Sequence, residues 1–139
     1  MGDLLLASIK TSGSGMEAQS FRLRTIAENL ANAQSTGSTP GSNPYRRKQV
    51  TFGSEMDRLT GAEMVKVKRV VNDPKPFELT FDPGNPAADA KGYVKKPNVN
   101  MIVEMADMRE ASRSYESNLQ AIKQAKEMIS MTIDLLRST

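Results

Sequence analysis

The sequence predicts a mainly α-helical protein in which long helices at the two ends of the chain pair in a coiled-coil-like manner, with a short-stranded β segment inserted between them. Apolar residues recur at heptad spacing near both ends of the 139-residue chain, and all seven prolines lie between them. Short alternating stretches occupy the same middle region. The expected division is a discontinuous helical assembly domain of residues 1–34 and 98–139, a flexible loop of residues 35–44, and a small β domain of residues 45–97.

The first helix is expected to carry an apolar repeat from Leu5 to Ala33 and to end near Gln34. Two alternating sets of apolar residues form one stripe along it. The stripe comprises Leu5, Ile9, Met16, Leu23, Ile26 and Leu30. Gly13 and Gly15 weaken the first half, because a glycine in a helix interior costs about 1 kcal/mol relative to alanine. We therefore expect the first dozen residues to be helical only when they are packed.

The middle of the chain begins with a loop and continues with strands. Residues 35–44 are rich in Ser, Thr, Gly and Pro, which end helices and form turns. The expected strands are residues 48–52, 65–71 and 77–81. In the last of these, Phe77, Leu79 and Phe81 share one face. Five prolines between residues 74 and 97 are expected to confine the strands to short, edge-like pieces.

The second helix is expected from Asn98 to about Arg137, a stretch without Pro or Gly. Its apolar stripe comprises Met101, Met105, Met108, Tyr115, Leu119, Ile122, Ile129, Ile133 and Leu136. At 1.5 Å per residue this helix is about 60 Å long and the first about 45 Å, too long for a 15 kDa globule. Uncovered apolar area of this kind marks an interface. We predict that both stripes form an assembly interface; the alternative is a long helical hairpin in a monomer.

Composition restricts the chemistry. The chain has no Cys and no His, which excludes disulfides, thiolate metal sites and the usual acid–base group at neutral pH. Ser, Lys and carboxylate residues are scattered without a catalytic motif. We expect a protein that is not an enzyme, with no catalytic residue, cofactor or bound metal.

The charge pattern favours a solvated surface over a nucleic-acid site. The net charge of +3 arises in residues 45–97, where basic residues come in short runs with few aromatics between them. A basic nucleic-acid-binding protein remains an alternative. The apolar run of residues 4–7 is too short for a secretory signal, and no stretch is long enough for a membrane span. These features alone indicate a cytoplasmic protein, unless a route without a signal peptide exports it.

Several stretches together carry a family resemblance. They are residues 14–20, 27–33, 44–52, 82–94, 97–100, 104–105 and 111–118. The chain resembles the axial proteins of the bacterial flagellum, and most closely the proximal rod family FlgC. The motif residues that match are Asn29, Leu30, Ala31, Asn32, Asn98, Val99 and Asn100.

The resemblance implies a structural subunit of the flagellar basal-body rod that polymerises through its terminal helices into a tubular drive shaft. It implies a periplasmic location reached through type III export without a cleaved signal peptide. The implied partners are other rod subunits, membrane ring proteins and export-gate proteins in a hetero-oligomeric helical assembly, with no nucleic acid and no insertion into the membrane. Another rod or hook-junction subunit, or a small helical adaptor, is the alternative.

Overall fold

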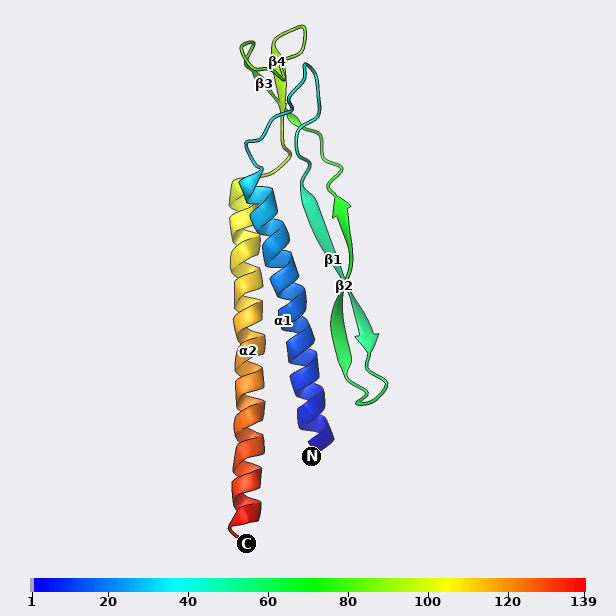
Figure 1. Ribbon diagram of the computed structural model, residues 1–139, viewed down its shortest axis with the longest axis vertical. Coiled ribbons are helices and arrows are strands. Elements are labelled where there is room, and N and C mark those ends of the chain that lie inside the picture. The colour runs from blue at the N-terminus through cyan, green and yellow to red at the C-terminus, as the bar shows by residue number, and fades with distance from the viewer. Residues whose placement is uncertain (1) are drawn as a thin grey trace. The chain divides into compact units, whose positions relative to one another are not determined.

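The computed structural model describes residues 2–139 and contains two long helices with four strands between them (Figure 1). The elements are α1 (Gly2–Ala31), β1 (Lys48–Met56), β2 (Glu63–Asn72), β3 (Glu78–Phe81), β4 (Tyr93–Lys96) and α2 (Met101–Arg137). The predicted fold class is confirmed. Along the described residues, neither helix has a stretch that is long and apolar enough to cross a membrane.

Helix α1 is continuous through both of its glycines, so the predicted weak first half is helical. Asp3 in the first turn complements the positive end of the helix dipole. The helix ends at Ala31, three residues before the expected end. There the amide of Asn32 donates to the carbonyl of Glu28, and the backbone leaves the helix through a turn.

Strands β1 and β2 form a two-stranded sheet of nine- and ten-residue strands. Both strands are longer than predicted, because every proline near them lies outside their bounds, and in a two-stranded sheet both are edge strands. The connecting loop is closed by Asp57, whose backbone N–H donates to the carbonyl of Ala62, and by Gly61 at a φ of 68°. A glycine at this positive φ avoids the strain that a side chain would introduce.

Strands β3 and β4 form a second, antiparallel sheet in which Leu79 pairs with Lys95 and Phe81 with Tyr93. The sequence did not predict β4. Phe77, expected in the strand, precedes β3 and packs under the guanidinium of Arg46 at 4.2 Å from the ring centre.

Contacts divide the chain into two compact units. Unit 1 comprises Met1–Leu23, Thr51–Arg69 and Arg109–Thr139, and unit 2 comprises Arg24–Val50 and Val70–Met108. The buried apolar residues of unit 1 are Ala18, Ala62, Ala111 and Ala125; those of unit 2 are Ile26, Ala33, Ala87 and Val94. The division of the protein into helical and β domains stays a prediction.

Candidate functional site

In unit 1 the two helices contact each other, and one of the contacts depends on a glycine. Arg22 pairs with Glu110, and Gly15 lies against Asn118, so the two segments run antiparallel (Figure 1). A Cβ atom on Gly15 would come within 2.7 Å of Asn118 Nδ2. Only glycine fits here without a shift of Asn118, so the Asn118 side chain packs directly against the backbone of α1.

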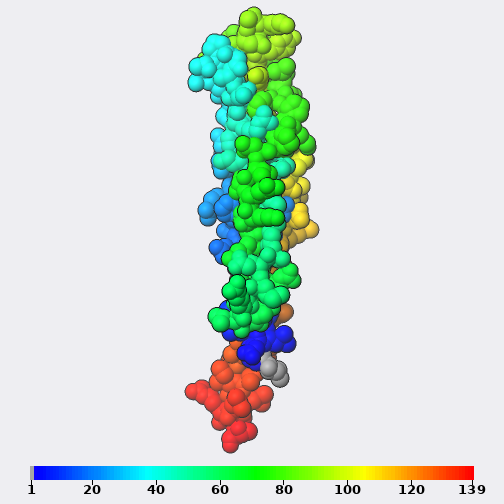
Figure 2. Space-filling view, turned by 90° about the vertical axis from the view of Figure 1, so that its right-hand side faces the viewer, coloured from blue at the N-terminus to red at the C-terminus, as the bar shows by residue number. Residues whose placement is uncertain are grey.

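The larger apolar residues of the predicted stripes keep accessible surface. Ile26 is buried; the half-buried members are Leu5, Ile9, Met16, Leu23, Leu30, Met108, Tyr115, Leu119, Ile122 and Ile129. The exposed members are Met101, Met105, Ile133 and Leu136. In Figure 2 the last turns of α2, coloured red, lie uncovered by other segments of unit 1. That these stripes join neighbouring subunits stays a prediction.

In unit 2 the motif residue Asn29 is 1% exposed and uses its whole side-chain amide. Its Nδ2 donates to the carbonyl of Lys48 at 2.9 Å and to Glu104 Oε2 at 3.2 Å. Its Oδ1 accepts from the hydroxyl of Tyr45 at 2.7 Å and from the backbone N–H of Lys48 at 3.0 Å. An amide supplies two donors and two acceptor positions, so neither Asp nor Leu could replace it.

Glu104, which is 0% exposed, links Asn29 to a cluster around Arg47. The Arg47 guanidinium donates through Nε to Glu104 and lies 3.2 Å from a carboxylate oxygen of Asp73 and 3.3 Å from one of Asp107. Three carboxylates thus surround one cation. Buried charges persist where they are paired and hydrogen-bonded in this way.

The pKa values of the cluster reflect this pairing. Burial acts to lower the pKa of Arg47, but the hydrogen bonds and charges of Glu104 and Asp73 outweigh it and raise that pKa. Burial acts to raise the pKa of Asp73, but hydrogen bonds from Lys75 and Arg47 and their positive charges lower it. For Tyr45, burial and then the charges of Glu28 and Glu104 raise the pKa to about 12. Arg47 and Asp73 are therefore held in their charged forms, and Tyr45 in its neutral form.

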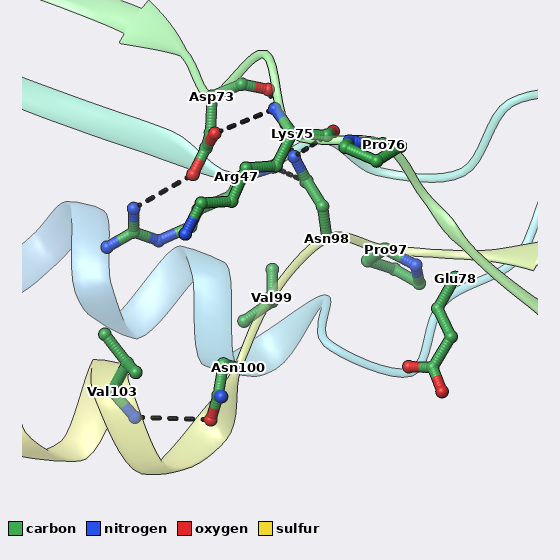
Figure 3. Close-up of a pocket in the computed structure, with 10 residues that line it drawn as sticks. All are labelled: Arg47, Asp73, Lys75, Pro76, Glu78, Pro97, Asn98, Val99, Asn100 and Val103. Atoms are coloured by element: carbon green, nitrogen blue, oxygen red, sulfur yellow. Dashed lines mark hydrogen bonds and ion pairs between the residues drawn. The ribbon is translucent and has the colours of Figure 1, made fainter.

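The second motif, residues 97–100, joins the same cluster to the start of α2 (Figure 3). Asn98 accepts from the backbone N–H of Arg47 at 2.7 Å and donates to the carbonyls of Asp73 and Lys75 at 3.0 Å each. Asn100 caps α2, since its Oδ1 accepts from the N–H groups of Ile102 and Val103.

A pocket of about 300 Å³ lies beside this motif in unit 2 (Figure 3). It is lined by Arg47, Asp73, Lys75, Pro76, Glu78, Pro97, Asn98, Val99, Asn100 and Val103. The polar atoms of Arg47, Asp73 and Asn98 are already hydrogen-bonded within the chain. The arrangement is suited to holding segments together and to presenting a surface.

The structure thus joins Asn29 and Asn98, one from each predicted motif, to the adjacent residues Lys48 and Arg47. Among the other motif residues, Leu30 is half-buried, Ala31 is the exposed last residue of α1, and Val99 lines the pocket. Sequence reasoning missed the central group of Tyr45, Arg47, Asp73 and Glu104. Their pairing depends on contacts far apart in the sequence, which no local periodicity reports.

Comparisons with known proteins place these features in a family. The model described as "Flagella basal body rod protein" matches residues 9–37, and that described as "Flagellar basal body rod FlgEFG protein C-terminal" matches residues 90–135. The flagellar basal-body rod protein FlgC of Agrobacterium fabrum is 58% identical over 99% of both chains. FlgC of Escherichia coli O6:H1 is 46% identical, and that of Salmonella typhimurium 45%, each over 94% of this chain and 97% of the relative. The chain belongs to the FlgC family of flagellar basal-body rod proteins.

Proposed function

We propose that this chain is a structural subunit of the proximal part of the flagellar rod, and that it polymerises through its terminal helices into a tubular shaft that transmits torque. Family membership supports a rod subunit. The observation that carries the assembly mechanism is the apolar surface that both helices leave accessible.

The balance of buried and exposed apolar residues supports this mechanism. Of the described residues, eight apolar side chains are buried, six of them alanines, whereas seventeen large apolar side chains are exposed. The accessible area is 9578 Å². A compact monomer of this mass is expected to expose about 7,100 Å². Partners that cover such surface stabilise a subunit by mass action.

The proposed partners are other rod subunits, with membrane ring and export-gate proteins at the base of the rod. The proposed location is the periplasmic part of the basal body, reached by export without a cleaved signal peptide. Stacking through two different surfaces of each subunit propagates helically, as a tube requires.

The test uses two aspartate substitutions in α2, introduced into the source bacterium. Ile133 is 49% exposed, so Ile133→Asp should leave the chain folded and abolish its incorporation into rods, because the carboxylate would be buried at a subunit contact. Ser130→Asp adds the same charge at an exposed position off the predicted stripe and should leave swimming intact. Basal bodies isolated from each strain report incorporation. Normal rods containing the Ile133 variant would contradict the proposal.

A further inference from the structure

The β3–β4 sheet of unit 2 presents an apolar face that the described residues leave uncovered. Leu79, Phe81 and Tyr93 are 61%, 63% and 42% exposed. The register pairs Leu79 with Lys95 and Phe81 with Tyr93, so these four side chains share one face. We call them the hairpin patch.

The hairpin patch is organised before any partner binds. The rings of Phe81 and Tyr93 meet edge to face, with their centres 5.4 Å apart. Gly92, at a φ of 85°, lies under Phe81; a Cβ atom there would come within 2.9 Å of the ring. An exposed, ordered aromatic pair loses little conformational freedom on binding, which is typical of the residues that dominate interfaces.

The one charge on the hairpin patch lacks an acidic partner among the described residues. The ammonium group of Lys95 donates to Asn43 Oδ1 at 3.1 Å and to the carbonyl of Gly41 at 3.5 Å, both neutral acceptors. A partner that covers the patch should therefore combine apolar side chains with a carboxylate.

The last turns of α2 offer this combination. Met128, Met131 and Leu135 lie three and four residues apart on one helix face, and all are exposed. Glu127 and Asp134 lie together along one side of this face, are exposed, and form no ion pair within the described part of the chain. We call these five residues the outer face of α2.

We propose that the hairpin patch of one copy receives the outer face of α2 from a second copy, with Lys95 opposite Asp134. This contact rests on the proposed function, because it joins two different surfaces and therefore propagates instead of closing into a dimer. Three large apolar residues on each side bury far less than the area of a stable complex. The contact is therefore weak between two free copies. In a polymer, many such contacts act together and stabilise the assembly.

Crosslinking tests the contact, since the chain has no cysteine and each variant then carries a single thiol. Full-length Leu79→Cys is mixed with Leu135→Cys and treated with a short bismaleimide. We expect several times more crosslinked dimer than from Leu79→Cys mixed with Lys126→Cys, whose thiol is exposed on the opposite side of the same helix. Equal yields from the two mixtures would overturn the proposal. So would an equal yield from Leu79→Cys alone, which would show that the patch pairs with itself.

A charge reversal tests the pairing of Lys95 with Asp134. Asp134→Lys in the Leu135→Cys chain should lower the yield about two- to fivefold, as expected for an exposed ion pair, and Lys95→Asp in the other chain should restore it. An unchanged yield of crosslinked dimer in both mixtures would overturn this pairing. Circular dichroism verifies that each variant is folded. Should the crosslink fail while Ile133→Asp still blocks rod formation, this contact is wrong and the proposed function stands.

Discussion

Asn29 and Arg47 show how single residues hold unit 2 together. Asn29 satisfies backbone groups of Lys48 and side chains of Tyr45 and Glu104, while Arg47 collects three carboxylates. Each polar group of this cluster is hydrogen-bonded or ion-paired to another member, so removal of one member leaves buried polar atoms without partners. Such a cluster costs much more to break than its individual hydrogen bonds contribute.

Asn29→Ala is expected to destabilise the protein by at least about 3 kcal/mol, because it leaves several buried groups unpaired at about 1–3 kcal/mol each. Asn32→Ala is the matched control, three residues further along the motif. It removes only a bond to the carbonyl of Glu28 on the surface and should cost less than about 1 kcal/mol. Urea unfolding followed by circular dichroism measures both. Equal losses would show that Asn29 is not central to the cluster.

Asp73 predicts a dependence of stability on pH. Its folded pKa lies below the ordinary value of 3.8, so its contribution is complete above that value and declines as the pH falls toward the folded pKa. The free energy of unfolding should therefore differ most between the native chain and Asp73→Asn at neutral pH, and the difference should shrink in acid. Urea titrations at about pH 6 and about pH 3 measure it. A constant difference would contradict the pairing of Asp73 with Arg47.

At the scale of elements, one contact between α1 and α2 in unit 1 depends on Gly15, which leaves room for the side chain of Asn118. The sequence predicted both helices, because a long heptad repeat without proline permits few other structures. It did not predict that Gly15 would lie against Asn118, since heptad reasoning assigns the contacts between helices to the large apolar residues. The alternation of residues 77–81 placed Leu79 and Phe81 on one face of a strand, and the structure leaves both side chains exposed.

Two glycines of α1 should respond differently to the same substitution. Gly13→Ala should stabilise the protein by about 0.5–1 kcal/mol, since nothing lies within 4 Å of the added Cβ atom. Gly15→Ala should lose that gain, because the new methyl group meets Asn118, whose amide is held by the carbonyl of Ser114. Thermal unfolding of both variants measures the contrast.

A double variant that also removes the Asn118 side chain serves as the control. In a chain that already carries Asn118→Ala, Gly15→Ala should become as favourable as Gly13→Ala. If Gly15→Ala stabilises the native chain as much as Gly13→Ala does, the contact between Gly15 and Asn118 is not a constraint.

For the whole molecule, the fold class and the family could be predicted from the sequence, because both depend on extended patterns. The central group of the buried cluster could not, because the sequence does not show that residue 47 meets residues 73, 104 and 107. Strand β4 was not predicted, because its two adjacent lysines, Lys95 and Lys96, obscure the alternation of apolar and polar residues. Its Val94 is nevertheless buried.

Backbone protection should differ strongly along the isolated chain. Residues 131–139 are all exposed, so the amides of residues 131–137 should exchange hydrogen quickly in the purified protein. The backbone around Asn29, which is buried, should exchange slowly. In isolated basal bodies the helix end should become protected. Hydrogen exchange measured by mass spectrometry compares the two states, and fast exchange in both would argue against burial of this helix end in the rod.

The alanine-dominated interior also has a calorimetric consequence. Exposure of apolar surface to water is what raises the heat capacity on unfolding, and the free chain buries little of it. Its heat-capacity increment should fall below the typical ~12–15 cal/mol/K per residue, which flattens the dependence of stability on temperature. The missing increment should appear when subunits associate, as a negative heat-capacity change of polymerisation. Much of the dependence of stability on temperature would then arise from assembly into the rod and not from the folding of the subunit.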